Sequence, residues 1–213
     1  PYALRRQGIG IIQIILEESL DFSLSSIIDK GLQAYIDDSD NRNETALKVI
    51  SFLKNRMINI LTDRGFSKEA VGSALWASFD NLPDVVLRVK ALDNLRKKPD
   101  FEPLSITFKR VENIIKKADV KQGQKIHENL FEDSSEAALL SAVNEVSNRV
   151  LGLIQEGDYD KALSHIATLR PKVDTFFDDV MVMAEDETIR LNRIALLSSV
   201  SDLFKNIADF SRI

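Results

Sequence analysis

The sequence contains no cysteine, which excludes disulfide bonds and thiolate metal sites from the 213-residue chain. Histidine is nearly as scarce: only His127 and His165 are present, and neither belongs to an HExxH or HxH motif. A histidine-based metal site or a nucleophile–histidine pair therefore has no support. The sequence also lacks a G-x-x-x-x-G-K-[ST] loop, and Gly8 and Gly10 are not followed by the third glycine of a dinucleotide site. These patterns identify no active site.

Long apolar runs are also missing. The most apolar stretch, Ile9–Leu16, is interrupted by Gly10 and Gln13, and it is shorter than the roughly 20 residues that cross a bilayer. Its acidic flank, Glu17 and Glu18, does not fit a signal peptide. We therefore expect a buried helix at this position, a cytoplasmic protein and no membrane partner.

Glycine and proline are few, with eight and five residues, and alternating β-branched segments are absent. Apolar residues instead recur at three- and four-residue steps in almost every segment, which predicts an all-α protein. We expect helices over residues 2–19, 24–35, 46–62, 70–79, 85–98, 104–118, 134–156 and 159–169. We expect a loop at 37–43, a hinge at 81–84 and a break at 99–103. This pattern predicts a smaller helical segment at residues 1–80 and a helical bundle at residues 81–213.

The segment Val173–Ile213 predicts two further helices. After Pro171, which suits a first helical turn, apolar residues recur on one face up to Met183. An acidic turn at 185–187 favours the start of a second helix, whose apolar stripe continues without a break from Ile189 to Phe210. Arg193 interrupts this stripe and must either extend its charged end to solvent or find a carboxylate partner, and a structural ion pair is the preferred interpretation. The expected partners are Glu185, Asp186, Glu187, Asp174 and Asp178.

The acidic residues of this segment could also suggest a Mg²⁺ or Ca²⁺ site. They are Asp174, Asp178, Asp179, Glu185, Asp186 and Glu187. They lack the spacing and the central glycine of an EF-hand. Asp174 and Asp178 lie four residues apart on the outer face of their helix, so a solvated face is the preferred interpretation. We predict no metal site.

Charge is distributed unevenly along the chain. The net charge of −5 argues weakly against nucleic-acid binding as an average. Between Arg88 and Lys125, however, basic residues outnumber acidic ones, whereas carboxylates dominate from Ile126 to Glu187. The basic residues are Arg88, Lys90, Arg96, Lys97, Lys98, Lys109, Arg110, Lys116, Lys117, Lys121 and Lys125. This distribution is compatible with one phosphate-facing surface.

The helix expected at residues 108–118 is the strongest binding candidate. Its buried stripe is predicted to contain Phe108, Val111, Ile115 and Ala118. Its opposite side gathers cations and an amide, which suit phosphates and base edges respectively. These residues are Lys109, Arg110, Asn113, Lys116 and Lys117. From the pattern alone, a solvated lysine-rich face is the preferred alternative.

Three segments together resemble one family. The run VDTFFDDVMVMAEDETIRLNRIALLSSVSDLFKNIADFSRI resembles the carboxy-terminus of the beta subunit of bacterial heterotetrameric glycyl-tRNA synthetase. The opening PYALRRQGIGIIQIILEE is similar to an internal stretch of that subunit, and within it Arg5 and Arg6 are similar to a family signature. FKRVENIIKK resembles the KRVxNI helix of the DALR-type anticodon-binding domain of that family. The resemblance implies a fragment that starts within the subunit.

The resemblance also implies a function. The expected chain is a non-catalytic, tRNA-binding region with a DALR-type helical bundle. The whole enzyme would join glycine to its tRNA using ATP and Mg²⁺, with the activation chemistry chiefly in a separate alpha subunit. No cofactor and no DNA are expected for this chain. The expected RNA contacts are Lys109, Arg110, Asn113, Lys116, Lys117, Arg190 and Asn192.

Other interpretations stay open at this point. A helical scaffold for docking other domains or subunits would also explain the chain, with its cations serving solubility. An independent helical enzyme is disfavoured by the missing catalytic patterns. For Arg5 and Arg6, a salt bridge between helices is at least as good an explanation as RNA contact.

Overall fold

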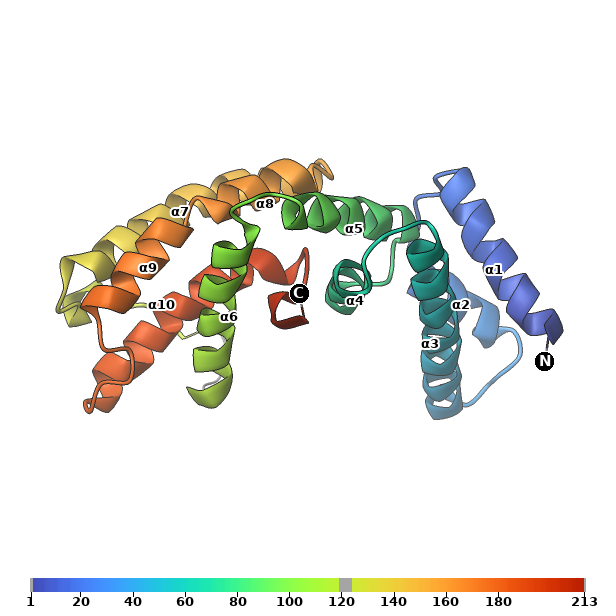
Figure 1. Cartoon of the computed structure of the whole chain (residues 1–213). Helices are drawn as coiled ribbons and strands as arrows, with labels where there is room; N and C mark the ends of the chain where they lie inside the picture. Colours follow the sequence, from blue (N-terminus) through green and yellow to red (C-terminus); the bar gives the residue numbers. More distant parts are fainter. Residues whose placement is uncertain (1, 119–123, 213) are drawn as a thin grey trace. The chain divides into compact units, whose positions relative to one another are not determined.

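A computed structural model describes residues 2–118 and 124–212 (Figure 1). All regular structure in these residues is helical, which confirms the all-α prediction. The chain divides into two compact units, Pro1–Asp93 and Asn94–Ile213. This division lies after Asp93, inside the continuous helix α5 (Leu82–Arg96), whereas the sequence suggested a boundary after residue 80. Within the described residues, no helix combines the length and apolar character needed to cross a membrane.

The expected hinge at residues 81–84 is the start of α5. Asn81 accepts a hydrogen bond from the backbone N–H of Asp84 at 3.0 Å, as a helix cap does. Pro83 lies in the first turn, where its missing N–H has no helical partner to lose. The prediction of a hinge was therefore wrong, because this proline begins a helix instead of interrupting the chain.

The first unit is built from four helices and most of α5. These helices are α1 (Tyr2–Glu17), α2 (Leu24–Gln33), α3 (Ser39–Asp63) and α4 (Lys68–Ala77). Helix α3 begins inside the expected loop at 37–43, because the Asp38 carboxylate accepts hydrogen bonds from the N–H groups of Asp40 and Asn41. This cap makes a polar segment helical, since it satisfies donors that the first turn leaves unpaired.

Helices α1 and α3 of this unit pack closely at Gly8. A Cβ atom at this position would lie 2.7 Å from Cε1 of Phe52, which is too close for any residue other than glycine without a shift of the ring. Ile12 of α1 and Met57 of α3 are fully buried. The two helices are therefore held together along their inner faces, and their outer edges form the walls of a groove described below.

The second unit contains the end of α5 and the remaining helices. These are α6 (Phe101–Ala118), α7 (Ser134–Gln155), α8 (Tyr159–Ala167), α9 (Arg170–Asp179) and α10 (Glu187–Lys205), with 3₁₀ turns η1 (Glu128–Leu130) and η2 (Phe210–Arg212). Helix α6 includes Pro103 in its first turn, so the expected break at 99–103 is shorter than predicted.

Helix α10 is shorter than its apolar stripe suggests. It ends at Lys205, although Ile207, Ala208 and Phe210 beyond it are also buried. The expectation of one unbroken helix to Phe210 was therefore wrong. The apolar stripe reflects burial in the bundle, and a turn followed by η2 buries these side chains without a continued helix.

A charged cap begins α8 and gives a pH-dependent contribution to stability. Gly157 has a φ of 73°, a left-handed conformation that suits glycine, and it leads into the N-cap residue Asp158. The Asp158 carboxylate accepts the N–H of Lys161 at 3.2 Å and lies 2.6 Å from its ammonium group. The hydrogen bond between these side chains lowers the pKa of Asp158 and raises the pKa of Lys161.

We predict that Asp158→Asn removes a stabilising contribution that exists only in a middle pH range. The contribution is present above the ordinary carboxyl pKa of about 3.9 and is lost as the pH falls through the lower folded value. It is equally lost as the pH rises beyond the ordinary lysine pKa of about 10.4 and through the raised folded value. Urea unfolding of both proteins from pH 2 to 11 measures the difference, and a difference that is independent of pH would contradict the assignment. Asparagine keeps the cap, so the comparison isolates the charge.

Candidate nucleic-acid interface

The inner face of α6 is anchored to the core of the second unit by aromatic rings. The Phe108 ring centroid lies 4.4 Å from that of Phe204 and 6.2 Å from that of Phe210. Phe204 and Phe210 are 4.1 Å apart. Val111 is also buried on this face, as the sequence predicts. The tilted and edge-to-face contacts fix the rotation of α6 against α10 and η2.

Polar contacts add to this anchoring. The Thr107 hydroxyl donates to the Asp174 carboxylate of α9 at 2.7 Å, and Arg170 Nε lies 3.2 Å from the same carboxylate. The Ser201 hydroxyl of α10 donates to the Glu112 carboxylate. Asp174 is therefore a partner of α6 although its side chain remains 40% exposed, whereas the spacing had suggested only a solvated face. This difference arises because helix spacing alone does not show which neighbour covers a face.

The outer side of α6 carries the residues that we call the basic face. It consists of Lys109, Arg110, Asn113, Lys116 and Lys117. Lys109 is half-buried and the other four are exposed. None of the five forms an ion pair with a carboxylate of the described residues. The structure therefore brings together, on one surface, the five residues of α6 that the sequence singles out.

Arg110 has an additional contact that the sequence did not predict. Its guanidinium carbon lies 4.0 Å from the centroid of the Phe177 ring, which belongs to α9. Phe177 lies on the apolar face that the sequence predicts for this segment, and it is buried. The cation–π contact restricts the guanidinium to one orientation while leaving its outer side open.

The polar groups of Arg190 and Asn192 in α10 form hydrogen bonds within the protein. Arg190 Nη1 donates to the carbonyl oxygens of Ala184 and Glu185 at 2.8 and 3.3 Å. Asn192 is 3% exposed, and its amide forms hydrogen bonds of 2.7 and 3.0 Å with the backbone N–H and C=O of His127. Asn192, one of the RNA contacts expected from the sequence, is therefore buried within the protein. Because both its amide oxygen and its amide nitrogen bind the segment that precedes α7, we assign it a structural role.

Arg193 forms the structural ion pair that the sequence predicts, but with other partners. Its Nε lies 3.1 Å from Glu136 Oε1, its Nη2 lies 2.7 Å from Glu132 Oε2, and its Nη1 donates to the carbonyl of Met181 at 3.1 Å. Glu136 is fully buried. The acidic turn at 185–187 starts α10 as predicted, with Asp186 as its N-cap, but the ion pairs of Arg193 are formed with Glu132 and Glu136. The partners come from the region where α7 begins, which no local spacing could identify.

Glu136 has a second function in the same network. Its Oε2 accepts the backbone N–H groups of Glu132 and Asp133 at 2.8 and 3.0 Å, as the Glu of a capping box does. The sequence Asp133-Ser-Ser-Glu136 carries this signature, so the cap could have been recognised from sequence. Arg193 and Asn192 thus tie α10 to both the start of α7 and the segment at His127.

Comparison with known proteins assigns both parts of the chain. Residues 104–210 match the family described as DALR anticodon binding domain, and residues 1–76 match the family described as glycyl-tRNA synthetase beta subunit. The chain is 55% identical over 213 residues to the glycine–tRNA ligase beta subunit of Desulforapulum autotrophicum, and 49% identical over 217 residues to that of Desulfatibacillum aliphaticivorans. It is 42% identical over 214 residues to that of Geotalea uraniireducens.

These alignments cover all of the chain but only part of each relative. The chain spans 31% of the length of each of the three proteins. The basic face of α6 and the Arg193 network both lie within the first of the matched ranges, residues 104–210. Since that range covers half of the sequence, the chain belongs to the DALR anticodon binding domain family, and its beginning carries the match to the glycyl-tRNA synthetase beta subunit family.

Proposed function

We propose that this chain is the anticodon-recognising region of a glycine–tRNA ligase beta subunit and that the basic face of α6 contacts the RNA. The observation that supports this most directly is the group of four cations and one amide on one helix side, without an ion pair to any described carboxylate. Their position within the matched domain favours RNA contact over a merely solvated surface.

The chemistry of the basic face suits a single-stranded loop. Lys109, Lys116 and Lys117 provide point charges for phosphates, which give affinity and register. Asn113 is exposed and has an amide that can pair with a base edge, as is usual where RNA sequence is read in a loop. Arg110, held against Phe177, presents a planar guanidinium on which a base or a phosphate can lie.

The activity of the whole enzyme follows from the relatives as part of the same proposal. The complete protein would attach glycine to its tRNA in the cytoplasm, using ATP and Mg²⁺, together with an alpha subunit. We assign no catalytic step to the residues of this chain. Its contribution is to hold the tRNA at a fixed place on a rigid helical bundle.

A docking function is a second candidate, supported by exposed apolar side chains on α1. Leu4 and Ile14 are 55% and 58% exposed, and an apolar groove runs between α1 and α3 beside Leu4, Gly8 and Phe52. Exposed apolar surface of this kind favours contact with another protein surface. Docking on this groove and RNA binding on the basic face are compatible, because they use different helices.

We predict that changing Lys109, Arg110, Lys116 and Lys117 together to alanine weakens glycine-tRNA binding by at least about tenfold. Four lost phosphate contacts should also lower the slope of log affinity against log salt by about three. Fluorescence anisotropy with labelled tRNA at several salt concentrations measures both. The matched control changes four exposed cations elsewhere to alanine: Lys30, Lys68, Arg149 and Lys172. Equal affinity of the two variants, or no binding by the unchanged chain, would contradict the proposal.

A further comparison separates sequence reading from phosphate binding. Asn113→Ala should reduce discrimination between glycine tRNA and the same tRNA with an altered anticodon, while the salt slope stays unchanged. If discrimination is unaffected, Asn113 does not read a base.

A further inference from the structure

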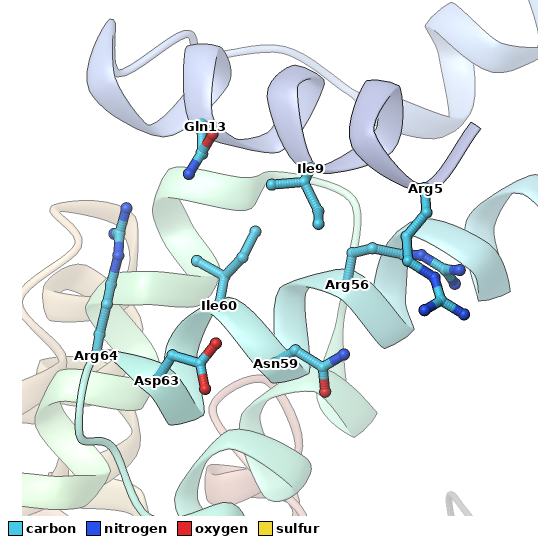
Figure 2. A pocket seen from close by; sticks show the side chains of 8 residues that line it. All are labelled: Arg5, Ile9, Gln13, Arg56, Asn59, Ile60, Asp63 and Arg64. Carbon is cyan, nitrogen blue, oxygen red and sulfur yellow. The ribbon is translucent and has the colours of Figure 1, made fainter. Parts of the chain in front are cut away.

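A groove lies between α1 and α3 in the first unit, outside the domain that carries the basic face (Figure 2). Its volume is about 560 Å³, within the range of about 300–1,000 Å³ typical of ligand sites. Ile9 and Ile60 face one another across its middle, as Figure 2 shows. The polar lining residues are Arg5, Gln13, Arg56, Asn59, Asp63 and Arg64. The groove thus joins an apolar floor to charged ends.

Positive charge in this groove is not neutralised by the surrounding protein. Arg5, Arg56 and Arg64 form no ion pair with a carboxylate among residues 2–118 and 124–212, and Asp63 is the one acidic residue in the lining. The salt bridge considered for Arg5 and Arg6 from the sequence is therefore not formed within the described residues. Placing cations together without a counter-charge is unfavourable, so this arrangement favours binding of an anion.

The two arginines at one end form the more defined part of the groove. The side chains of Arg5 and Arg56 are directed to the same end, whereas Asp63 and Arg64 lie toward the other (Figure 2). Arg56 is oriented by two contacts: its guanidinium carbon lies 3.6 Å from the Phe52 ring centroid, and its Nη1 donates to the Phe52 carbonyl at 2.9 Å. Such a fixed guanidinium loses little freedom when it binds a phosphate.

We propose that this groove binds a phosphodiester of RNA, with the phosphate between Arg5 and Arg56 and the attached nucleoside over Ile9 and Ile60. The inference rests on the proposed function, because it takes RNA as the ligand, and it adds a second RNA contact in the other compact unit. The amides of Gln13 and Asn59 border the apolar floor and can pair with sugar or base atoms. Asp63 repels a phosphate at the far end, so the Arg5–Arg56 end takes the anion.

Arg5→Gln compared with Arg6→Gln tests this proposal in the full chain. Both arginines are exposed on α1 and neither has an ion pair among the described residues, but only Arg5 lines the groove. Arg5→Gln should weaken binding of full-length glycine tRNA by about five- to tenfold and lower the salt slope by about one, whereas Arg6→Gln should stay within about twofold of the unchanged chain. Far-UV circular dichroism confirms that both variants remain helical.

Titrations with other anionic ligands test whether the groove binds a phosphate of RNA or another anion. The unchanged chain and both variants are titrated at constant ionic strength with ATP, with inorganic pyrophosphate and with a polyglutamate peptide. If Arg5→Gln loses one of these ligands and keeps its RNA affinity, the groove takes a free nucleotide, a free phosphate or an acidic peptide, and the RNA assignment is overturned. Equal RNA binding by the Arg5 and Arg6 variants also overturns it.

The basic-face variant makes this failure distinguishable from failure of the proposed function. If that variant loses RNA affinity and Arg5→Gln does not, only the groove is excluded. If the unchanged chain binds no RNA, both proposals fall.

Discussion

Replacing Arg193 with methionine is expected to lower the free energy of unfolding by about 3–5 kcal/mol. The variant leaves the Glu136 carboxylate fully buried with its cationic partner removed, and an unpaired buried charge costs more than an intact pair contributes. It also removes the donors that bind Glu132 and the Met181 carbonyl. The loss should therefore be as large as that of a severe large-to-small change in an apolar core.

Urea unfolding followed by far-UV circular dichroism measures this loss. The matched control is Arg190→Met on the same helix, which removes only hydrogen bonds to the backbone carbonyls of Ala184 and Glu185, just before the helix begins. Combining Arg193→Met with Glu136→Gln should recover part of the stability, because glutamine keeps an acceptor for the α7 cap without a buried charge. Equal losses in the Arg190 and Arg193 variants would show that the ion pair is not the source of the effect.

The network around Arg193 explains how the end of the chain supports the proposed RNA surface, which it does not itself form. Asn192 holds the backbone at His127, and Arg193 holds the start of α7. Phe204 of the same helix packs on Phe108 behind the basic face. One face of α10 therefore fixes α6, α7 and the segment that precedes α7. The residues that best identify the family are in this way mainly structural.

Local patterns in the sequence predicted most of the helices correctly. Three- and four-residue spacing identified the helices because a buried face leaves a periodic record of apolar residues. Caps such as Ser67 and Asp133 could also be recognised, since their hydrogen bonds reach only two or three residues along the chain. Errors arose at Ser39 and Lys205, where a cap or the tertiary packing decided the helix end.

Long-range partners could not be predicted in the same way. The sequence showed that Arg193 needs a carboxylate, but Glu136 is 57 residues away and had no spacing relation to it. The contact of Arg110 with Phe177 and the groove beside Arg56 could not be predicted for the same reason. Both depend on which helices pack together, and a periodic pattern shows that a helix face is buried without showing which other helix covers it.

Arg88 shows that a basic segment of the sequence does not always form a basic surface. It was included in the basic segment that suggested a phosphate-facing surface, yet its side chain is fully buried in the first unit. Its Nη1 and Nη2 donate to the carbonyls of Ala74 and Ser78 at 2.7 and 2.9 Å, and its Nε donates to Asp84 at 2.9 Å. It therefore closes the carboxyl end of α4, and it cannot contribute to an RNA surface.

Arg88→Met is accordingly expected to destabilise the first unit by about 3 kcal/mol, because the carbonyls of Ala74 and Ser78 and the carboxylate of Asp84 each lose a donor at once. Trp76 is the single tryptophan of the chain and lies in α4, so its fluorescence reports this unit directly during urea unfolding. Lys90→Met, at an exposed position of α5 close to Arg88, should change the midpoint of urea unfolding little. Arg88→Lys should recover only part of the loss, since one ammonium group cannot reproduce the planar fork that reaches both carbonyls. A lysine variant as stable as the unchanged chain would instead show that charge alone matters at this site.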